Sequence, residues 1–142
     1  MARNLASLPK DVTEDVAKEF IAERPFTGLP GFWVMIERDG RVIGSAGIGG
    51  APLSLGYYLE VAQRGQGVMT EALGAFLAEV FARFPARRIV ADHFVDNPAS
   101  GSVLKKLGFV ETDRGMGTSR ARVEPAPVIN YALLRENLKV PA

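Results

Sequence analysis

The feature that most constrains the fold is a central stretch with the pattern of a strand, a glycine-containing turn and the start of a long helix. It occupies 56–72, with the sequence GYYLEVAQRGQGVMTEA. A second strand pattern, RIVADHFV, follows the helix at 88–95. Two strands joined by a crossover helix form a parallel pair with a right-handed connection. The chain is therefore expected to have an α/β architecture, with helices layered on a sheet.

The turn in this stretch, Arg64-Gly65-Gln66-Gly67, lies at the corner between the strand and the helix. Glycine has no Cβ, so the backbone of such a turn can approach a ligand closely. The free N–H groups in the first turn of a helix attract anions. The corner therefore predicts a cradle for a phosphate or a pyrophosphate.

The remaining segments supply further strands and helices around this unit. Strand patterns occupy 32–37, 41–48, 55–61, 109–112 and 128–134. Helical patterns occupy 68–84 and a short segment from Asn97-Pro98 to Gly108. A further helix is expected to begin at Asp11 or Thr13 and to end at Pro25. Asp39-Gly40 predicts a tight hairpin turn, and 113–127 is expected to be a polar connection. The glycines within 41–48 indicate either a bulge or close approach of a ligand, or else a place where a large side chain packs over the sheet.

Composition narrows the class of protein. Residues 1–142 are expected to form one domain. A formal charge of +1 argues against a nucleic-acid partner. The sequence has no cysteine and a single histidine, His93, so a disulfide, a cysteine nucleophile and a multi-histidine metal site are not expected. The sequence shows no signal-peptide pattern and no apolar run that could span a membrane, so a cytoplasmic protein without a membrane partner is expected.

A second corner, Asp96-Asn97-Pro98-Ala99-Ser100, follows the second strand of the parallel pair. Ligands in open α/β sheets bind beyond the carboxyl ends of the strands, where both corners lie. Together with Leu107-Gly108-Phe109, the two corners resemble the GNAT superfamily of acetyl-CoA-dependent N-acetyltransferases. Gly56-Tyr57-Tyr58-Leu59, Thr70-Glu71-Ala72 and Asn97-Pro98-Ala99-Ser100 resemble its RimJ/RimL branch, which contains ribosomal-protein N-terminal acetyltransferases. The resemblance extends over 5–134.

The resemblance implies a mixed central sheet with flanking helices, in which the strand over 57–61 carries a bulge and splays from its parallel neighbour. The pantetheine arm of acetyl-CoA would enter the resulting V, and CoA would leave as the product. Three groups of residues are expected to contact acetyl-CoA. Backbone groups of Leu59, Glu60 and Val61 would pair with the pantetheine amides, and Asn97 and Ser100 would lie beside the pantetheine arm. The pyrophosphate would be held by the N–H groups of Arg64, Gly65, Gln66, Gly67, Val68 and Met69.

The sequence departs from the family pattern in three places. Met69 occupies the last place of the phosphate-binding turn, where the family usually has Gly or Ala, so its side chain would either crowd the cofactor or point into the core. Leu104 occupies the place of a tyrosine general acid, which makes Ser100 the candidate that protonates the leaving thiolate. Relatives usually have a strand and a helix before the segment that resembles 5–9, and without them an exposed sheet edge would favour a homodimer.

The implied reaction is direct attack of a primary amine, on a protein N-terminus or a small molecule, on the thioester of acetyl-CoA. Glu60 is the first candidate for the general base, with Asp92 and His93 on the neighbouring strand as alternatives. A paired strand carboxylate and a structural histidine are the simpler interpretations of Glu60 and His93. A backbone N–H near Val61 would stabilise the oxyanion. Ser100 would be the general acid or only a helix-surface hydroxyl.

The acceptor amine is less well defined by the sequence. Tyr57 and Tyr58 are both expected to be packing residues, and Tyr58 is also a candidate for a wall of the acceptor cleft. Arg120 and Arg122 either attract an acidic acceptor or are simply solvated. A non-catalytic acyl-CoA-binding sensor or assembly module is the alternative function. A dinucleotide- or triphosphate-binding domain is disfavoured, because the sequence lacks both the acidic residue at Rossmann spacing and a Lys-Ser/Thr pair after the glycines.

Overall fold

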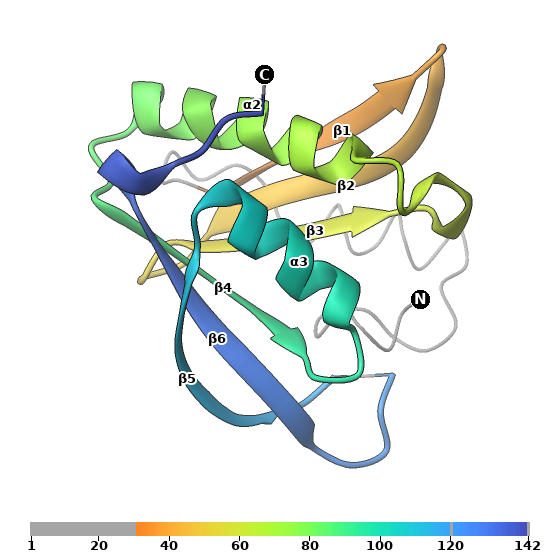
Figure 1. Ribbon diagram of the computed structural model, residues 1–142, viewed down its shortest axis with the longest axis vertical. Helices are drawn as coiled ribbons and strands as arrows, with labels where there is room; N and C mark the ends of the chain where they lie inside the picture. The colour runs from red at the N-terminus through yellow and green to blue at the C-terminus, as the bar shows by residue number, and fades with distance from the viewer. Residues whose placement is uncertain (1–30, 120, 142) are drawn as a thin grey trace.

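The computed structural model describes residues 31–119 and 121–141, in which the strand patterns form one mixed sheet (Figure 1). The strands are β1 (Phe32–Arg38), β2 (Arg41–Gly49), β3 (Ser54–Leu59), β4 (Arg88–Phe94), β5 (Val110–Gly117) and β6 (Ala126–Leu134). The helical elements are α2 (Val68–Arg83), α3 (Pro98–Leu107) and the 3₁₀ turns η2 (Val61–Gln63) and η3 (Arg135–Asn137). The helix expected between Asp11 and Pro25 lies outside the described residues. Within the described ranges, no helix has the length and apolar character needed to cross a membrane.

One parallel contact joins two antiparallel halves of the sheet. The strand order across the described residues is β1-β2-β3-β4-β6-β5. β1, β2 and β3 form one antiparallel half, and β4, β6 and β5 form the other. β3 and β4 run parallel, as the crossover helix predicts. Figure 1 shows α2 and α3 on the same side of the sheet, so the expected mixed sheet with flanking helices is confirmed.

The first hairpin confirms the turn predicted at Asp39-Gly40. Both residues have positive φ, 53° and 77°, which gives a tight turn the twist that its flanking strands need. In β2, a Cβ on Gly47 would overlap the ring of Trp33, which covers this glycine from β1. At Gly47, packing of a large side chain is therefore the correct one of the two interpretations.

The core lies between the sheet and the two helices. Apolar residues at helical spacing on α2 include Leu73, Leu77 and Val80, whose exposed fraction is 0%. They belong to the same buried cluster as Ile89 of β4 and Leu133 of β6. Burial of each such side chain contributes about 1.5–3 kcal/mol to the free energy of unfolding. This cluster holds the crossover helix against the sheet. It thereby positions the two corners, which follow the carboxyl ends of β3 and β4.

β3 is shorter than the strand expected over 55–61. The Glu60 N–H donates to the Ile43 carbonyl at 2.8 Å, and the N–H groups of Gln63 and Arg64 then close a 3₁₀ turn with bonds of 3.0 and 3.2 Å. Val61 lies outside the strand, in the 3₁₀ turn, and its side chain is 65% exposed. The register of β3 with β2 has no shift along its length, so the expected bulge is absent from β3. The 3₁₀ turn, rather than a bulge, redirects the chain.

β5 is longer than the strand expected over 109–112. It pairs with β6 as far as Gly117 and Ala126, with one register shift between Glu111 and Asp113. The polar residues are tolerated because β5 lies at the edge of the described sheet and is exposed along most of its length. The polar connection expected over 113–127 is therefore reduced to 118–125. β1 lies at the other edge of the described sheet, and pairing of an edge with a second chain stays a prediction.

Candidate active site

β3 and β4 separate soon after they begin. Among the described residues, their parallel ladder has one pair, Ser54 with Val90, and the Val90 N–H donates to the Leu53 carbonyl at 2.9 Å. Beyond this pair the two strands diverge (Figure 1). We call these diverging strands the V. Its geometry confirms the expected splay, and the two corners lie at its open end, where β3 and β4 stop.

The first corner is held open by two glycines. Gly65 and Gly67 have φ of 76° and 77°, a conformation that costs an L-residue roughly 1–2 kcal/mol. A Cβ on either glycine would have no atom within 4 Å. Within the described part of the chain, neither N–H has a backbone partner, and α2 starts immediately afterwards at Val68. The corner thus combines free N–H groups with open space, which is the arrangement that binds anions at helix N-termini.

Met69 does not obstruct this corner. Its side chain is 5% exposed and belongs to the core cluster. Of the two orientations considered for the sequence, the one that points into the core is therefore correct. The backbone N–H of Met69 remains in the first turn of α2, where no intrahelical acceptor exists.

The backbone groups at the end of β3 are partly engaged. The Leu59 carbonyl accepts a hydrogen bond from Arg64 Nε at 3.1 Å, and the Glu60 N–H donates to Ile43. The Val61 N–H has no partner among the described residues. Val61, one of the three residues expected to bind pantetheine through their backbone, therefore offers a free donor at the end of β3.

Glu60 is held by an arginine from the neighbouring hairpin. Its Oε1 forms an ion pair with Arg41 Nη2, and its Oε2 is buried without a hydrogen-bond partner among the described residues. A buried acceptor without a donor costs about 1–3 kcal/mol. One carboxylate oxygen is thus fixed by Arg41, and the other is left to accept a proton or an N–H group.

The second corner begins α3 with Asn97 as the N-cap residue and Pro98 in the first turn. The Asn97 side chain makes no capping hydrogen bond, although the backbone carbonyl of Asn97 accepts from the Ser100 N–H at 3.2 Å. Asn is a favoured N-cap residue, but here Pro98 and the backbone start the helix without a capping bond from the side chain. Within the part of the chain that the structure describes, the Asn97 side-chain amide makes no hydrogen bond to the helix N-terminus and is available to another partner.

Ser100 is hydrogen-bonded to Tyr57, for which the sequence suggested no polar partner. The Tyr57 hydroxyl, from β3, is hydrogen-bonded to Ser100 Oγ and also donates to the Ser100 carbonyl at 3.2 Å. Burial raises the pKa of Tyr57 to about 12, although the hydrogen bond with Ser100 opposes this shift. Tyr57 is therefore a neutral phenol at physiological pH, and it ties β3 to the first turn of α3 across the V.

A comparison with known families accounts for this arrangement of two corners at a splayed strand pair. The family model described as "Acetyltransferase (GNAT) domain" matches residues 2–110, which include the parallel pair and both corners. The chain belongs to the GNAT acetyltransferase family. No curated protein matches the chain in sequence at a significant level.

Solved structures show the same GNAT fold. The ribosomal-protein-S5-alanine acetyltransferase from Vibrio fischeri has a TM-score of 0.75 at 20% identity, over 97% of this chain and 81% of its own. A Salmonella typhimurium acetyltransferase that modifies the N-terminal serine of ribosomal protein L7/L12 has a TM-score of 0.80 at 18% identity, over 94% and 80%. Mycobacterium smegmatis RimJ, in complex with CoA-disulfide, has a TM-score of 0.74 at 22% identity, over 96% and 71%. At these identities the likeness establishes the fold.

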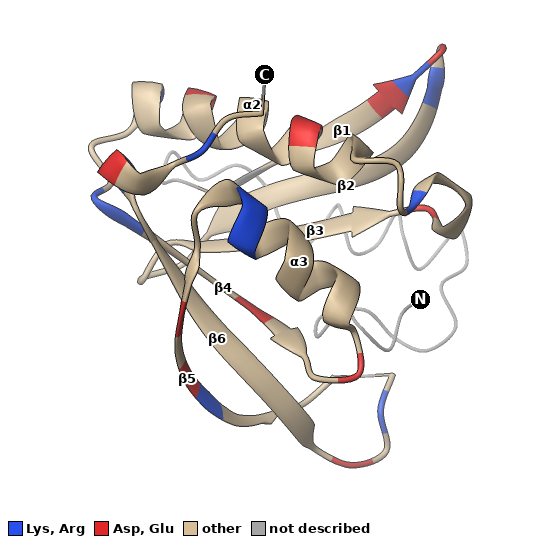
Figure 2. Cartoon of the chain, in the orientation of Figure 1, with Lys and Arg blue, Asp and Glu red and all other residues tan. Residues whose placement is uncertain are grey.

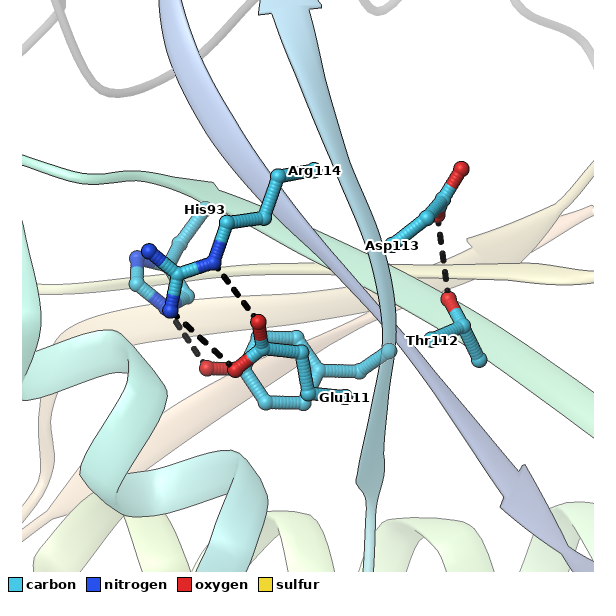
Figure 3. A network of polar contacts seen from close by, with 6 residues as sticks. His93, Glu111, Thr112, Asp113 and Arg114 are labelled. Atoms are coloured by element: carbon cyan, nitrogen blue, oxygen red, sulfur yellow. Dashed lines mark hydrogen bonds and ion pairs between the residues drawn. The ribbon is translucent and has the colours of Figure 1, made fainter.

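In this GNAT domain, His93 has a structural environment. Its Nδ1 donates to the Phe94 carbonyl at 2.7 Å, and its Nε2 pairs with the Tyr131 hydroxyl at 3.0 Å. Figure 3 shows His93 with its bond to the Tyr131 hydroxyl and, on β5, the hydrogen bond from Arg114 to Glu111, which lowers the pKa of Glu111. Both ring nitrogens of His93 are engaged and its side chain is buried, so it offers an amine no free nitrogen.

Asp92, the other alternative base, faces away from His93 along β4. It lines a hollow of about 390 Å³ with Asn130, its partner on β6, and Asp113 on β5. Desolvation in this hollow raises the pKa of Asp92, whereas the adjacent His93 opposes the shift. Asp92 is thus a carboxylate on a different face of β4 from the Tyr57–Ser100 contact.

Arg122 is paired with a carboxylate of the protein itself, so it is neither held ready for an acidic acceptor nor simply solvated. It forms two hydrogen bonds with the Asp96 carboxylate, at 2.8 and 2.9 Å, and its guanidinium lies 3.9 Å from the centre of the Phe94 ring. Its side chain is 12% exposed. Both sequence-based interpretations of Arg122 are therefore wrong, and it fastens the 118–125 connection to the second corner. Arg120 lies outside the described residues.

The hairpin tip contributes residues that the sequence did not indicate. Figure 2 shows charged residues of both signs at the tip of the β1–β2 hairpin. Arg38 donates to the side-chain oxygens of Gln63 and Gln66, at 3.1 and 3.0 Å, and all three line a hollow of about 460 Å³. The hairpin thereby supports the first corner from outside. Local pattern could not reveal this contact, because the partners are separated by 25 and 28 positions.

Proposed function

We propose that this GNAT domain transfers the acetyl group of acetyl-CoA to a primary amine, on a protein N-terminus or a small molecule, by direct attack. The observation that supports this proposal is the V with the open glycine corner at its end. The strands diverge beyond Ser54 and Val90, and Gly65 and Gly67 present free N–H groups where β3 ends. An extended ligand with a phosphate group at one end fits this combination.

Binding would depend mainly on backbone groups at the first corner and on side chains at the second. The free N–H groups that the described residues leave at the turn and in the first helical turn suit a pyrophosphate. When bound, acetyl-CoA supplies the thioester. Its proposed contacts are Leu59, Glu60 and Val61 at the end of β3, Arg64, Gly65, Gln66, Gly67, Val68 and Met69 at the first corner, and Asn97 and Ser100 at the second.

Each proposed catalytic group has one task in the transfer. The amine nitrogen bonds to the thioester carbon, and Glu60 Oε2 accepts the proton that the nitrogen loses. The Val61 N–H donates to the developing oxyanion. The C–S bond then breaks, the electron pair stays on sulfur, and the Ser100 hydroxyl donates a proton to the thiolate. Arg41 orients Glu60 for this role.

The first acceptors to examine are peptides. The Salmonella typhimurium and Vibrio fischeri proteins of similar fold act, by their names, on an N-terminal serine and on an alanine of ribosomal proteins. We therefore propose peptides that begin with serine or alanine as the first probes. A non-catalytic acyl-CoA-binding module is the second candidate, and the engagement of Glu60 by Arg41 is the observation in its favour.

Ligand class is tested by thermal unfolding with acetyl-CoA, CoA and NAD. A ligand that binds only the native state raises the unfolding free energy by about 2.7 kcal/mol at a hundred times its Kd. Acetyl-CoA and CoA should therefore raise the Tm, and NAD should not. A Tm that neither CoA species changes would refute both candidate functions.

Thiol release with the two peptides and a panel of small amines then separates an enzyme from a binding module. Glu60→Gln should lower kcat by about a hundredfold or more, since general-base catalysis typically contributes 10²–10⁴-fold. Glu79→Gln is the matched control, because Glu79 is an exposed carboxylate that pairs with Arg83 on α2. CoA binding without thiol release across the panel would favour the binding module.

A further inference from the structure

Tyr57 and Ser100 connect the two sides of the V through their hydroxyl groups. Tyr57 comes from β3 and Ser100 from the first turn of α3. We propose that Tyr57 is a positioning residue that holds the Ser100 hydroxyl and frees its proton for the leaving thiolate. This inference rests on the proposed acetyl transfer and assigns a task to a residue that the sequence placed only in the core.

Tyr57 and Ser100 share two hydroxyl protons among three oxygen atoms. The Tyr57 oxygen is within hydrogen-bond distance of two Ser100 atoms, the backbone carbonyl oxygen at 3.2 Å and Oγ. A carbonyl oxygen can only accept, whereas each hydroxyl has one proton and can both donate and accept. Two arrangements of the two protons are therefore possible: the first forms hydrogen bonds at both contacts, and the second forms only the one between the two hydroxyl groups.

In the first arrangement, Tyr57 donates to the Ser100 carbonyl, and Ser100 donates its own proton to the Tyr57 oxygen. The serine proton is then held inside the pair. In the second arrangement, Tyr57 donates to Ser100 Oγ, and the serine proton is free for a third atom. Rotation of the two hydroxyl groups interconverts the arrangements without moving a heavy atom, so Tyr57 controls whether Ser100 can donate outward.

The proton balance of the transfer agrees with the second arrangement. When the C–S bond breaks, sulfur keeps the electron pair and takes the Ser100 proton. The Tyr57 hydroxyl, which already donates to Ser100 Oγ, stabilises the serine oxygen at that moment. The proton that the amine loses to Glu60 passes to solvent, and solvent returns one to Ser100, so Tyr57 ends the cycle unchanged.

A purely structural tie between β3 and α3 would use the same hydrogen bonds, so the test must separate the two roles. The four proteins of the cycle are the wild type, Tyr57→Phe, Ser100→Ala and the double variant. For each, thiol release is measured with acetyl-CoA and the better of the serine- and alanine-initiated peptides, and CoA affinity is measured by calorimetry. Tyr131→Phe is the matched control, because it removes another buried hydroxyl, one that pairs with His93.

We expect Tyr57→Phe to lower kcat about tenfold, within the range of coupling between directly bonded residues, while KM and CoA affinity change less than about twofold. In the Ser100→Ala background the same substitution should change kcat less than about twofold, because the group that Tyr57 positions is gone. Tyr131→Phe should lower the Tm and leave kcat within about twofold of the wild type.

The contrary outcomes are distinct. The positioning role would be overturned if Tyr57→Phe lowered kcat equally with and without Ser100, or left kcat unchanged. Either result would leave the proposed transfer intact. A parallel loss of CoA affinity and Tm with an unchanged kcat would show a structural tie only. No thiol release from the wild type with either peptide or any amine would overturn the transfer, and the role of Tyr57 with it.

Discussion

Gly67 lies in the first corner of the V and Gly101 directly follows the second, and the structure favours glycine at each for opposite reasons. At Gly67 a Cβ would meet nothing within 4 Å, but φ is 77°. At Gly101, in α3, a Cβ would lie 2.6 Å from His93 Nε2 and 3.1 Å from the Tyr131 hydroxyl. The first corner is open and has a special backbone conformation, whereas the second has an ordinary helical backbone and no free space.

The difference indicates how each corner can contribute to a site. The first corner offers backbone N–H groups, so what matters there is the absence of a Cβ and of bulk. The second corner offers side chains, and close packing of α3 on β4 and β6 fixes where Ser100 lies. Substitutions at Gly67 should therefore change ligand binding with little effect on the core, and substitutions at Gly101 should do the reverse.

The largest effect is expected from Gly67→Glu. A carboxylate in the corner would repel phosphates and fill the space that they need, so CoA affinity should fall by about a hundredfold or more, beyond the roughly 1–2 kcal/mol of backbone strain. Calorimetry with CoA measures the loss. Gly67→Asn is the control, because Asn tolerates positive φ and adds no charge. Unchanged affinity in Gly67→Glu would refute the assignment of the phosphate site.

Gly101→Ala should destabilise the fold instead. Forcing a methyl group against His93 and Tyr131 is expected to lower the unfolding free energy by about 1–3 kcal/mol, as overpacked cores do. Urea denaturation measures this difference. Gly115→Ala is the matched control, because a Cβ there meets no atom within 4 Å. Equal losses in the two variants would show that the second corner is not tightly packed.

Asn97→Ala should have a smaller effect on stability than a typical N-cap substitution. The sequence alone suggests a loss of roughly 1 kcal/mol, but the side chain makes no capping bond. We therefore expect less than about 0.5 kcal/mol, as for other surface positions, together with weaker CoA binding. A loss near 1 kcal/mol with unchanged CoA affinity would restore the capping role and remove the binding role.

The smallest effect concerns Asp92, and its sign depends on pH. Because burial raises its pKa in the folded protein, the native state binds more protons than the unfolded state above the ordinary Asp pKa of about 3.9. Stability is thus lost as the pH rises through this range. Asp92→Asn should stabilise the protein more at pH 7 than at pH 3, as measured by urea midpoints. An equal shift at both pH values would contradict the cause assigned here.

Several parts of the fold follow from local sequence pattern. The crossover between β3 and β4, the Asp39-Gly40 hairpin and the buried face of α2 were predictable, because each depends on the spacing of residues close in sequence. β5 was predicted too short, because its register with β6 lets polar residues such as Asp113 remain in an edge strand. The end of β3 was misplaced because the bond from Glu60 to Ile43 depends on a neighbouring strand.

The candidate site was predictable only where backbone mattered. The glycine turn and the start of α3 have local signatures, so their positions were correct. The contacts of Tyr57 with Ser100, Arg41 with Glu60, and Arg122 with Asp96 join residues that are far apart in sequence. Periodicity assigns a face to each of these side chains but not a partner, so these contacts required the structure.

The single pair between Ser54 and Val90 also has a mechanical consequence. Among the described residues, the two three-stranded halves of the sheet share one ladder pair, and they are otherwise joined through the α2 crossover, the common core and the Tyr57–Ser100 contact. A ligand that formed hydrogen bonds with the edges of both β3 and β4 inside the V would act as an added strand and join the two halves of the sheet. Amide protons along the edges of β3 and β4 should then exchange with deuterium more slowly when CoA is bound.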